Sequence, residues 1–179
     1  PKAQIIYLSP VWKGFSFGVR QKIGFMNMRI EDTASKFNYD VDQSLSSFSL
    51  DYNPGPVSLS FQAGYEIYHH DINDHINDEV SHTYHDWMYH AIAQWNVNRH
   101  HRLRFAYDHD ITRPTYTQLY PFVHIGSSIS SWVVGNSALQ PSTSRQIQGR
   151  YTFTCTPLTL NGIVTYKTVD DDISGISTY

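Results

Sequence analysis

The chain has few of the features on which enzymes and disulfide-stabilised domains depend. Its 179 residues include one cysteine, Cys155, so no disulfide can form within the chain. No stretch approaches the ~18 consecutive apolar residues of a transmembrane helix. The balance of 13 Lys and Arg against 16 Asp and Glu gives a net charge of -3, which does not favour nucleic-acid binding. Gly-rich phosphate loops and Ser-His-Asp sets in a recognisable context are missing too, so we expect neither an enzyme nor a cofactor.

Alternation of apolar and polar residues is what the chain has instead. Between Val57 and Ile67 every second residue is apolar, and the residues between them are polar or small. The same alternation returns at 103–107 and at 147–153. A period of two predicts strands of a sheet with one apolar and one polar face. Aromatic residues make up 15% of the chain, which is typical of the aromatic girdles of a membrane barrel.

The connections between these strands alternate between short and long. About eight strands are expected, at 3–9, 14–30, 44–52, 57–70, 83–97, 101–111, 145–155 and 158–169. Short links rich in turn-forming residues fall at 9–13, 53–56, 98–100 and 156–157, and long links at 31–43, 71–82 and 112–144. Tight turns at one end and long loops at the other are typical of an outer-membrane β-barrel. We therefore expect an all-β, antiparallel up-and-down meander that forms part of a transmembrane β-barrel.

The two faces of the expected sheet are assigned from single strands. Trp87, Tyr89 and Trp95 share an apolar face, which we assign to lipid. Trp87 and Trp95 lie about 26 Å apart at ~3.3 Å per residue, which matches the height of the apolar band of a barrel. Cys155 falls on an apolar face as well, as a packed or lipid-facing residue and not a reactive thiol.

Charged residues on the opposite face indicate a water-filled lumen. Asp108 and Asp110 point to the same side of their strand as Arg102 and Arg104, whereas His109 points away. Such a ladder of inward charges is ordinary in a barrel and needs no catalytic explanation.

Two motifs stand in the longest connection. The first has the pattern R-P-x-Y-x-x-L-x-P-F and comprises Arg113, Pro114, Tyr116, Leu119, Pro121 and Phe122. The second comprises Gly135, Asn136, Leu139 and Pro141. Together they resemble a stretch in the barrel of TonB-dependent outer-membrane receptors. The chain departs from that pattern at Tyr120, Ser137 and Ser142.

The resemblance implies a function and a compartment. Receptors of this kind sit in the bacterial outer membrane and take up a scarce nutrient, such as an iron chelate, a vitamin or an oligosaccharide, at the expense of energy. Their barrels have roughly 22 strands around an N-terminal plug. Residues 1–179 would then be an internal or C-terminal part of one barrel domain, without its plug. The implied partners are the lipid bilayer, the plug, TonB through the missing N-terminal region, and a small-molecule nutrient.

Four residues of the longest connection are candidates for ligand binding: Arg113, Tyr116, Tyr120 and Asn136. A plainer interpretation is that these residues only shape the loop, because proline and the Gly135-Asn136 pair restrict its backbone. The sequence leaves both interpretations open.

Histidines raise a separate question of metal binding. Nine of the ten histidines fall between residues 69 and 109, and the weak candidates for metal ligands are His70, Asp71, Asp74 and His75. Their spacing matches no zinc or calcium motif, and neighbours such as His69 and His70 face opposite sides of a strand. A polar external loop with scattered histidines explains them equally well.

Two other classes of protein remain open at this point. Eight strands suffice to close a small barrel with a structural or adhesive role. A soluble carbohydrate-binding β-sandwich would also alternate apolar and polar residues, although its loop lengths would not differ so consistently between the two ends.

Overall fold

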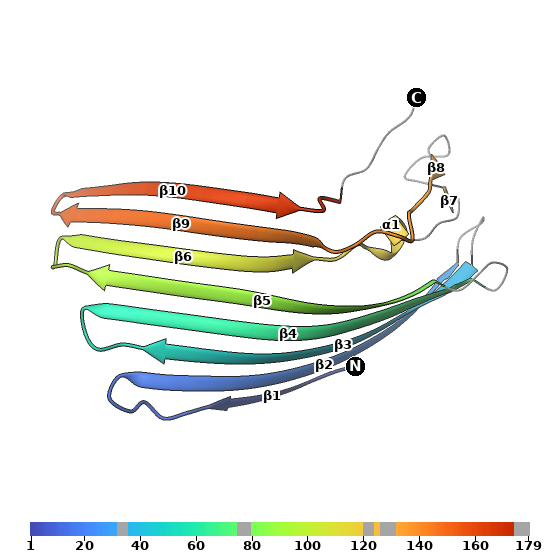
Figure 1. Cartoon of the computed structure of the whole chain (residues 1–179), viewed down its shortest axis with the longest axis horizontal. Helices are drawn as coiled ribbons and strands as arrows, with labels where there is room; N and C mark the ends of the chain where they lie inside the picture. The colour runs from blue at the N-terminus through green and yellow to red at the C-terminus, as the bar shows by residue number, and fades with distance from the viewer. Residues whose placement is uncertain (32–35, 75–79, 120–123, 126–131, 174–179) are drawn as a thin grey trace.

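Eight long strands form one antiparallel sheet in the computed structural model, which describes residues 1–31, 36–74, 80–119, 124–125 and 132–173. The strands are β1 (Lys2–Leu8), β2 (Phe15–Glu31), β3 (Lys36–Tyr52), β4 (Val57–Asp74), β5 (Val80–Asn96), β6 (His101–Thr112), β9 (Ser142–Cys155) and β10 (Leu158–Asp170). Each pairs with the next strand along the chain, and β9 follows β6 (Figure 1). The predicted up-and-down meander is confirmed.

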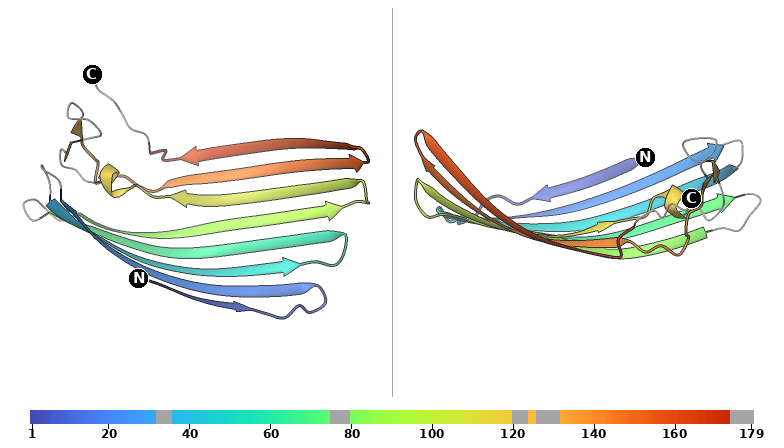
Figure 2. Two further views of the ribbon diagram at one scale, coloured as in Figure 1. Left: turned by 180° about the vertical axis from the view of Figure 1, so that it is seen from behind. Right: turned by 90° about the horizontal axis from the view of Figure 1, so that it is seen from above.

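The connection from β6 to β9 contains the remaining elements. They are the single helical turn α1 (Tyr116–Leu119) and a separate two-stranded sheet of β7 (His124–Ile125) and β8 (Trp132–Val133). No helix in the described part of the chain is long and apolar enough to span a membrane. The eight-stranded sheet is curved and open, with β1 at one edge and β10 at the other (Figure 2).

Several strands are longer than the sequence predicts. The strand expected at 44–52 begins at Lys36, and the strand expected at 57–70 continues to Asp74. The links predicted at 31–43 and 71–82 were therefore wrong, because residues 36–43, 71–74 and 80–82 belong to paired strands. The alternation changes phase there: Tyr39 and Val41 place apolar side chains on the inner face, and Asn38 and Asp40 place polar ones on the outer face. The ladder of backbone hydrogen bonds continues through this change.

The four short turns lie where the sequence predicts them, at one end of the sheet. In the turn between β1 and β2, Lys13 and Gly14 adopt positive φ angles of 48° and 84°. A Cβ atom on Gly14 would lie 2.9 Å from the carbonyl oxygen of Asn53, because the neighbouring turn between β3 and β4 donates its Asn53 amide to the Gly14 carbonyl at 2.7 Å. Glycine is needed here both for its backbone conformation and for this close approach.

The convex outer face carries the large apolar side chains. Cross-strand register places the following exposed residues on this one face: Phe15, Phe17, Phe48, Leu50, Leu59, Phe61, Trp87, Trp95, Phe105, Ile147, Tyr151, Leu160, Val164 and Tyr166. A contiguous apolar surface of this size requires an apolar environment around it. The lipid-facing assignment of Trp87 and Trp95 agrees with their place on this face.

On the side of the long connections, the outer face becomes polar beyond this apolar band. On β5, Trp95 lies near the short turns, and Trp87 lies eight residues away toward the long connections. Beyond Trp87 the outer positions are His85 and Thr83 on β5, and His69 on β4. β4 has 18 residues, whereas a tilted strand needs only about 9–11 residues to cross a bilayer. The strands therefore continue beyond the membrane on the side of the long connections, which we call the loop end.

The concave inner face is mainly polar in its central part. Residues of this face include Arg20, Lys22, Ser47, Gln62, His90, Arg104, Gln148, Arg150 and Thr165. A buried apolar cluster occurs only near the loop end of the described structure, where Tyr39, Val41, Ile72 and Leu119 pack together. Leu119 of α1 is fully buried in it, so the connection after β6 folds back onto the inner face (Figure 2).

Candidate functional site

The inner face at the loop end is built from the extended parts of β3, β4 and β5. On the outer face, Tyr65 and Trp87 pair directly across β4 and β5 and mark the border of the apolar band. Tyr84, His70 and Tyr39 lie further toward the loop end, outside the membrane-spanning segments. Residues 113–119 and 134–139, which we call the covering segment, lie over this part of the inner face. Its two stretches are joined by the Asn136 amide, which donates to the Gln118 carbonyl at 2.6 Å.

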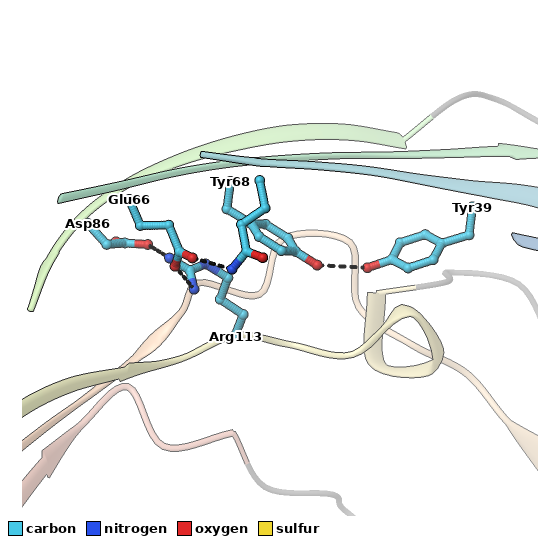
Figure 3. Close-up of polar contacts among 6 residues, drawn as sticks. Tyr39, Glu66, Tyr68, Asp86 and Arg113 are labelled. Atoms are coloured by element: carbon cyan, nitrogen blue, oxygen red, sulfur yellow. Dashed lines mark hydrogen bonds and ion pairs between the residues drawn. The ribbon is translucent and has the colours of Figure 1, made fainter. Parts of the chain in front are cut away.

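Arg113 attaches the covering segment to the sheet through two carboxylates (Figure 3). Glu66 of β4 and Asp86 of β5 are direct cross-strand partners on the inner face, and their like charges repel. Arg113 Nη1 lies 2.5 Å from Glu66 Oε2, and Nη2 donates to Asp86 Oδ2 at 2.5 Å. The guanidinium also lies 4.8 Å from the ring centre of Tyr68, and Gln43 donates a hydrogen bond to Glu66. We call these residues the Arg113 clamp.

Burial makes the clamp sensitive to the loss of any one of its partners. The Glu66 side chain is 3% exposed, Arg113 14% and Asp86 16%. Ion pairs of this kind depend on all partners being present, because a single buried charge without a counter-charge is costly. Arg113 therefore fixes the start of the covering segment immediately after the last residue of β6.

Tyrosines hold the rest of the covering segment. The hydroxyls of Tyr39 and Tyr68 lie 3.2 Å apart (Figure 3), and the rings of Tyr39 and Tyr116 are 5.6 Å apart between centres. The Tyr84 hydroxyl donates to the carbonyl oxygen of Leu139 at 3.2 Å. Burial raises the pKa of Tyr39 and of Tyr84 above the ordinary value of a phenol. Both hydroxyls are therefore protonated and can donate hydrogen bonds throughout the physiological pH range.

His70 lies at the centre of this aromatic surface. It is 1% exposed, and neither ring nitrogen has a hydrogen-bond partner among the described residues. Rings of Tyr39, Tyr68, His82 and Tyr84 surround it, with centres 5.5 to 6.2 Å away. Burial, followed by the neighbouring His82, lowers the pKa of His70 to about 4. His70 is therefore neutral at pH 7, and charging it would oppose the packing of the covering segment.

The structure places three of the four ligand-binding candidates on the covering segment. Arg113 is engaged with Glu66 and Asp86, and Tyr116 packs against Tyr39. Asn136 Oδ1 accepts a hydrogen bond from the Ala138 amide at 3.0 Å and so shapes its own turn. These contacts show a structural role for each of the three residues. Tyr120 lies outside the described residues.

The weak metal-ligand candidates are not brought together in the described structure. His70 and Asp71 lie on opposite faces of β4, and Asp71 Oδ2 accepts from His69 Nε2 at 3.0 Å. Within the described ranges no three His, Cys, Asp or Glu side chains are grouped to hold a metal ion. His75 and the side chain of Asp74 lie outside the described residues.

Sequence reasoning missed the partners of Arg113. Glu66 is the one charged residue on the polar side of the alternating stretch 57–67, and this was a usable signal. Asp86 carried no comparable signal, because only the register between β4 and β5 places it opposite Glu66.

The register places Arg102, Arg104, Asp108 and Asp110 together on the inner face, as the sequence predicts. Asp108 does face inward, but it is bonded to His90 of β5 and not to an arginine. Arg102 donates through Nε to the side-chain oxygen of Asn96 at 2.9 Å. The inner-face arginines near the short turns are therefore not neutralised by the aspartates of the same strand.

The outer face has an apolar groove of about 550 Å³ over the small side chains of Ala91 and Ala93, between Phe61 and Phe105. The groove lies within the apolar band, where lipid chains fill such hollows, so it is not a solute site.

Together these features define a class of protein. A curved antiparallel sheet of long strands, apolar outside within a tryptophan-bordered band and polar inside, is an outer-membrane β-barrel wall. The model of the outer membrane protein beta-barrel family matches residues 16–179, so the chain belongs to that family. The protein is located in the bacterial outer membrane. No curated protein matches the chain. The soluble β-sandwich considered from the sequence is wrong.

Proposed function

We propose that the chain is part of an outer-membrane receptor barrel for TonB-dependent uptake of a scarce nutrient, such as an iron chelate, a vitamin or an oligosaccharide. The observation that carries this proposal is the covering segment, which folds inward over the concave face and is held there by Arg113. Short turns of bacterial barrels face the periplasm and long loops face outward. The covering segment then lies at the external mouth of a conduit, where an incoming solute meets it.

The open sheet supports a barrel of more than eight strands. An eight-stranded barrel closes when its first and last strands pair. Here β1 and β10 lie at opposite edges of a gently curved sheet (Figure 1). Further strands added at these edges would complete a wider wall with a lumen large enough for a plug.

The proposal includes the partners and the chemistry of the barrel. Lipid contacts the outer face, a plug domain fills the lumen, and TonB acts through an N-terminal region that precedes the plug. Tyr116 and Asn136 belong to the segment that an incoming solute meets first, and we propose that the barrel itself catalyses no reaction and holds no cofactor.

Uptake by living cells tests this function. A strain that lacks the gene is compared with the parent strain for uptake of labelled iron chelates, cobalamin and oligosaccharides, with and without a protonophore. The proposal predicts that at least one solute is lost in the deletion strain and that the protonophore abolishes its uptake in the parent. Equal uptake of the whole panel by both strains, or uptake that the protonophore leaves unchanged, contradicts it.

A complete small barrel with a structural or adhesive role is the second candidate. The family to which the chain belongs is described as a barrel and not as a transporter, which suits this alternative as well. An immunoblot of outer-membrane fractions separates the two. A band several times heavier than 20.7 kDa supports the receptor, and a band near 20.7 kDa supports the small barrel.

A further inference from the structure

A polar hollow lies at the end of the sheet opposite to the Arg113 clamp. It has a volume of about 310 Å³ and lies at the turn between β5 and β6, beside β9. Its lining includes Asn96, Asn98, Arg99, His100, Arg102 and Thr154, and no residue of the lining is acidic. We call it the turn-end hollow.

The two arginines of the turn-end hollow are oriented by neutral groups. His100 donates through Nδ1 to the Thr154 carbonyl at 2.7 Å, so its Nε2 is free to accept, and Arg99 Nε donates to it at 2.9 Å. Arg102 Nε donates in the same way to Asn96 Oδ1 at 2.9 Å. Each guanidinium is thereby held in place through Nε, while its terminal nitrogens keep their hydrogen-bonding capacity and its charge is not cancelled.

Two more arginines lie next to the hollow on the inner face. Arg104 follows Arg102 on the same face of β6, and Arg150 of β9 is its direct cross-strand partner. Within the described residues none of these four arginines forms an ion pair with a carboxylate. The remaining cross-strand partners of this pair are uncharged: Gln94 lies opposite Arg104, and Ile163 lies opposite Arg150.

Like charges placed directly opposite each other in a sheet are destabilising. A wall that keeps four arginines together, two of them oriented by neutral acceptors, gains stability from an anion that binds among them. The planar guanidinium fork matches the oxygens of phosphate and carboxylate groups. The volume of the hollow is sufficient for one phosphate or carboxylate group together with part of its first hydration shell.

We propose that the turn-end hollow is an oxyanion site at the periplasmic mouth of the barrel, which takes a phosphate or carboxylate group. Arg99 and Arg102 bind the group directly, and Arg104 and Arg150 attract it along the inner face. The site does not depend on the proposed uptake function, because it follows from the arginines and from the orientation of the barrel.

Titration calorimetry of the full-length protein, purified in a non-ionic detergent, tests the site with inorganic pyrophosphate as the probe. Arg99→Gln and Arg102→Gln each remove one charge and are expected to weaken binding roughly 10-fold or more. Arg102→Lys keeps the charge but loses the fork, so its affinity should fall between those of the parent and Arg102→Gln.

Lys13→Gln is the matched control. Lys13 is a cation in another short turn at the same end of the sheet, and its amine lies 5.1 Å from the ring centre of Trp12, outside the hollow. Its replacement should change the affinity less than twofold. If the glutamine variants do not fold, two measurements still test the site. One is the affinity of Arg102→Lys relative to the parent protein. The other is the salt dependence of the parent, whose affinity for pyrophosphate must fall steeply between low and moderate salt.

A peptide of six aspartates with blocked ends distinguishes the two sources of the anion. Binding of pyrophosphate alone indicates that the natural occupant of the site is a small anionic solute. Tighter binding of the peptide indicates that the occupant is an acidic protein segment in the periplasm or lumen. Both results support the site. Absence of saturable binding of either probe, or equal binding by the parent and the Arg99 and Arg102 variants, overturns it.

Discussion

Replacement of Arg113 by glutamine tests the attachment of the covering segment most directly. The guanidinium contacts Glu66 and Asp86 at 2.5 Å each, and all three side chains are at most 16% exposed. Glutamine preserves much of the side-chain length but removes the charge. The two carboxylates, which lie directly opposite each other on β4 and β5, would then face each other without a counter-charge.

The expected cost follows from the burial of these groups. Removal of one partner from a buried ion pair typically destabilises a protein by about 3–5 kcal/mol, because the remaining charge is left without compensation. The loss falls on the equilibrium that detaches residues 113–119 from the sheet and not on the whole barrel. Since ~1.4 kcal/mol corresponds to tenfold, protection of these amides against hydrogen exchange should fall by roughly two to four powers of ten.

Hydrogen exchange measured by mass spectrometry in detergent provides the assay. Arg145→Gln is the control, because the ion pair of Arg145 with Asp170 is more than half exposed on both sides and should contribute little. Replacing Arg113, Glu66 and Asp86 together by neutral residues should restore part of the protection. Unchanged exchange of residues 113–119 in Arg113→Gln would refute the reasoning.

Three further predictions concern the aromatic surface and the lipid face. Tyr84→Phe removes the hydrogen bond to the Leu139 carbonyl, and exchange of residues 134–139 should quicken by a few-fold to about tenfold; exchange equal to that of the parent contradicts the assignment. The pKa of His70 is lowered to about 4, so between pH 6.5 and 4 the unfolded state binds more protons than the folded state. Stability therefore remains complete above pH 6.5 and falls on acidification through this window, by an amount on the order of 3 kcal/mol. In His70→Gln, the free energy of unfolding measured in urea should change far less with pH across this window. Ala91→Arg on the outer face, midway between the two border tryptophans, should cost about 2–4 kcal/mol in urea unfolding, whereas Gln62→Arg on the inner face should cost far less. Equal costs at the two positions would show that the faces are wrongly assigned.

Much of the candidate site was beyond sequence reasoning for identifiable reasons. Arg113 and Tyr116 were found through a motif, but the motif does not state what they contact. Glu66 and Asp86 are 20 residues apart in the chain, and the opposition of their carboxylates depends on the register set by the β4–β5 connection. His70 was expected at the last position of the strand 57–70, next to a loop, yet it is buried, because β4 continues to Asp74 and the rings of neighbouring tyrosines and His82 surround it.

The sequence by itself determined the strand order, the short turns and the two faces of the sheet. Alternation is a local property with a period of two, so Trp87 and Trp95 share a face whatever the rest of the chain does. Tertiary structure alone decided how far β3, β4 and β5 extend beyond the membrane, and that the connection after β6 returns to the inner face. Beyond the apolar band the outer face is polar and the apolar residues Tyr39, Val41 and Ile72 face inward, so the alternation changes phase along the strand. Cross-strand hydrogen bonds, the Arg113 clamp and the packing of Leu119 then determine the structure, and these contacts join residues far apart in the chain.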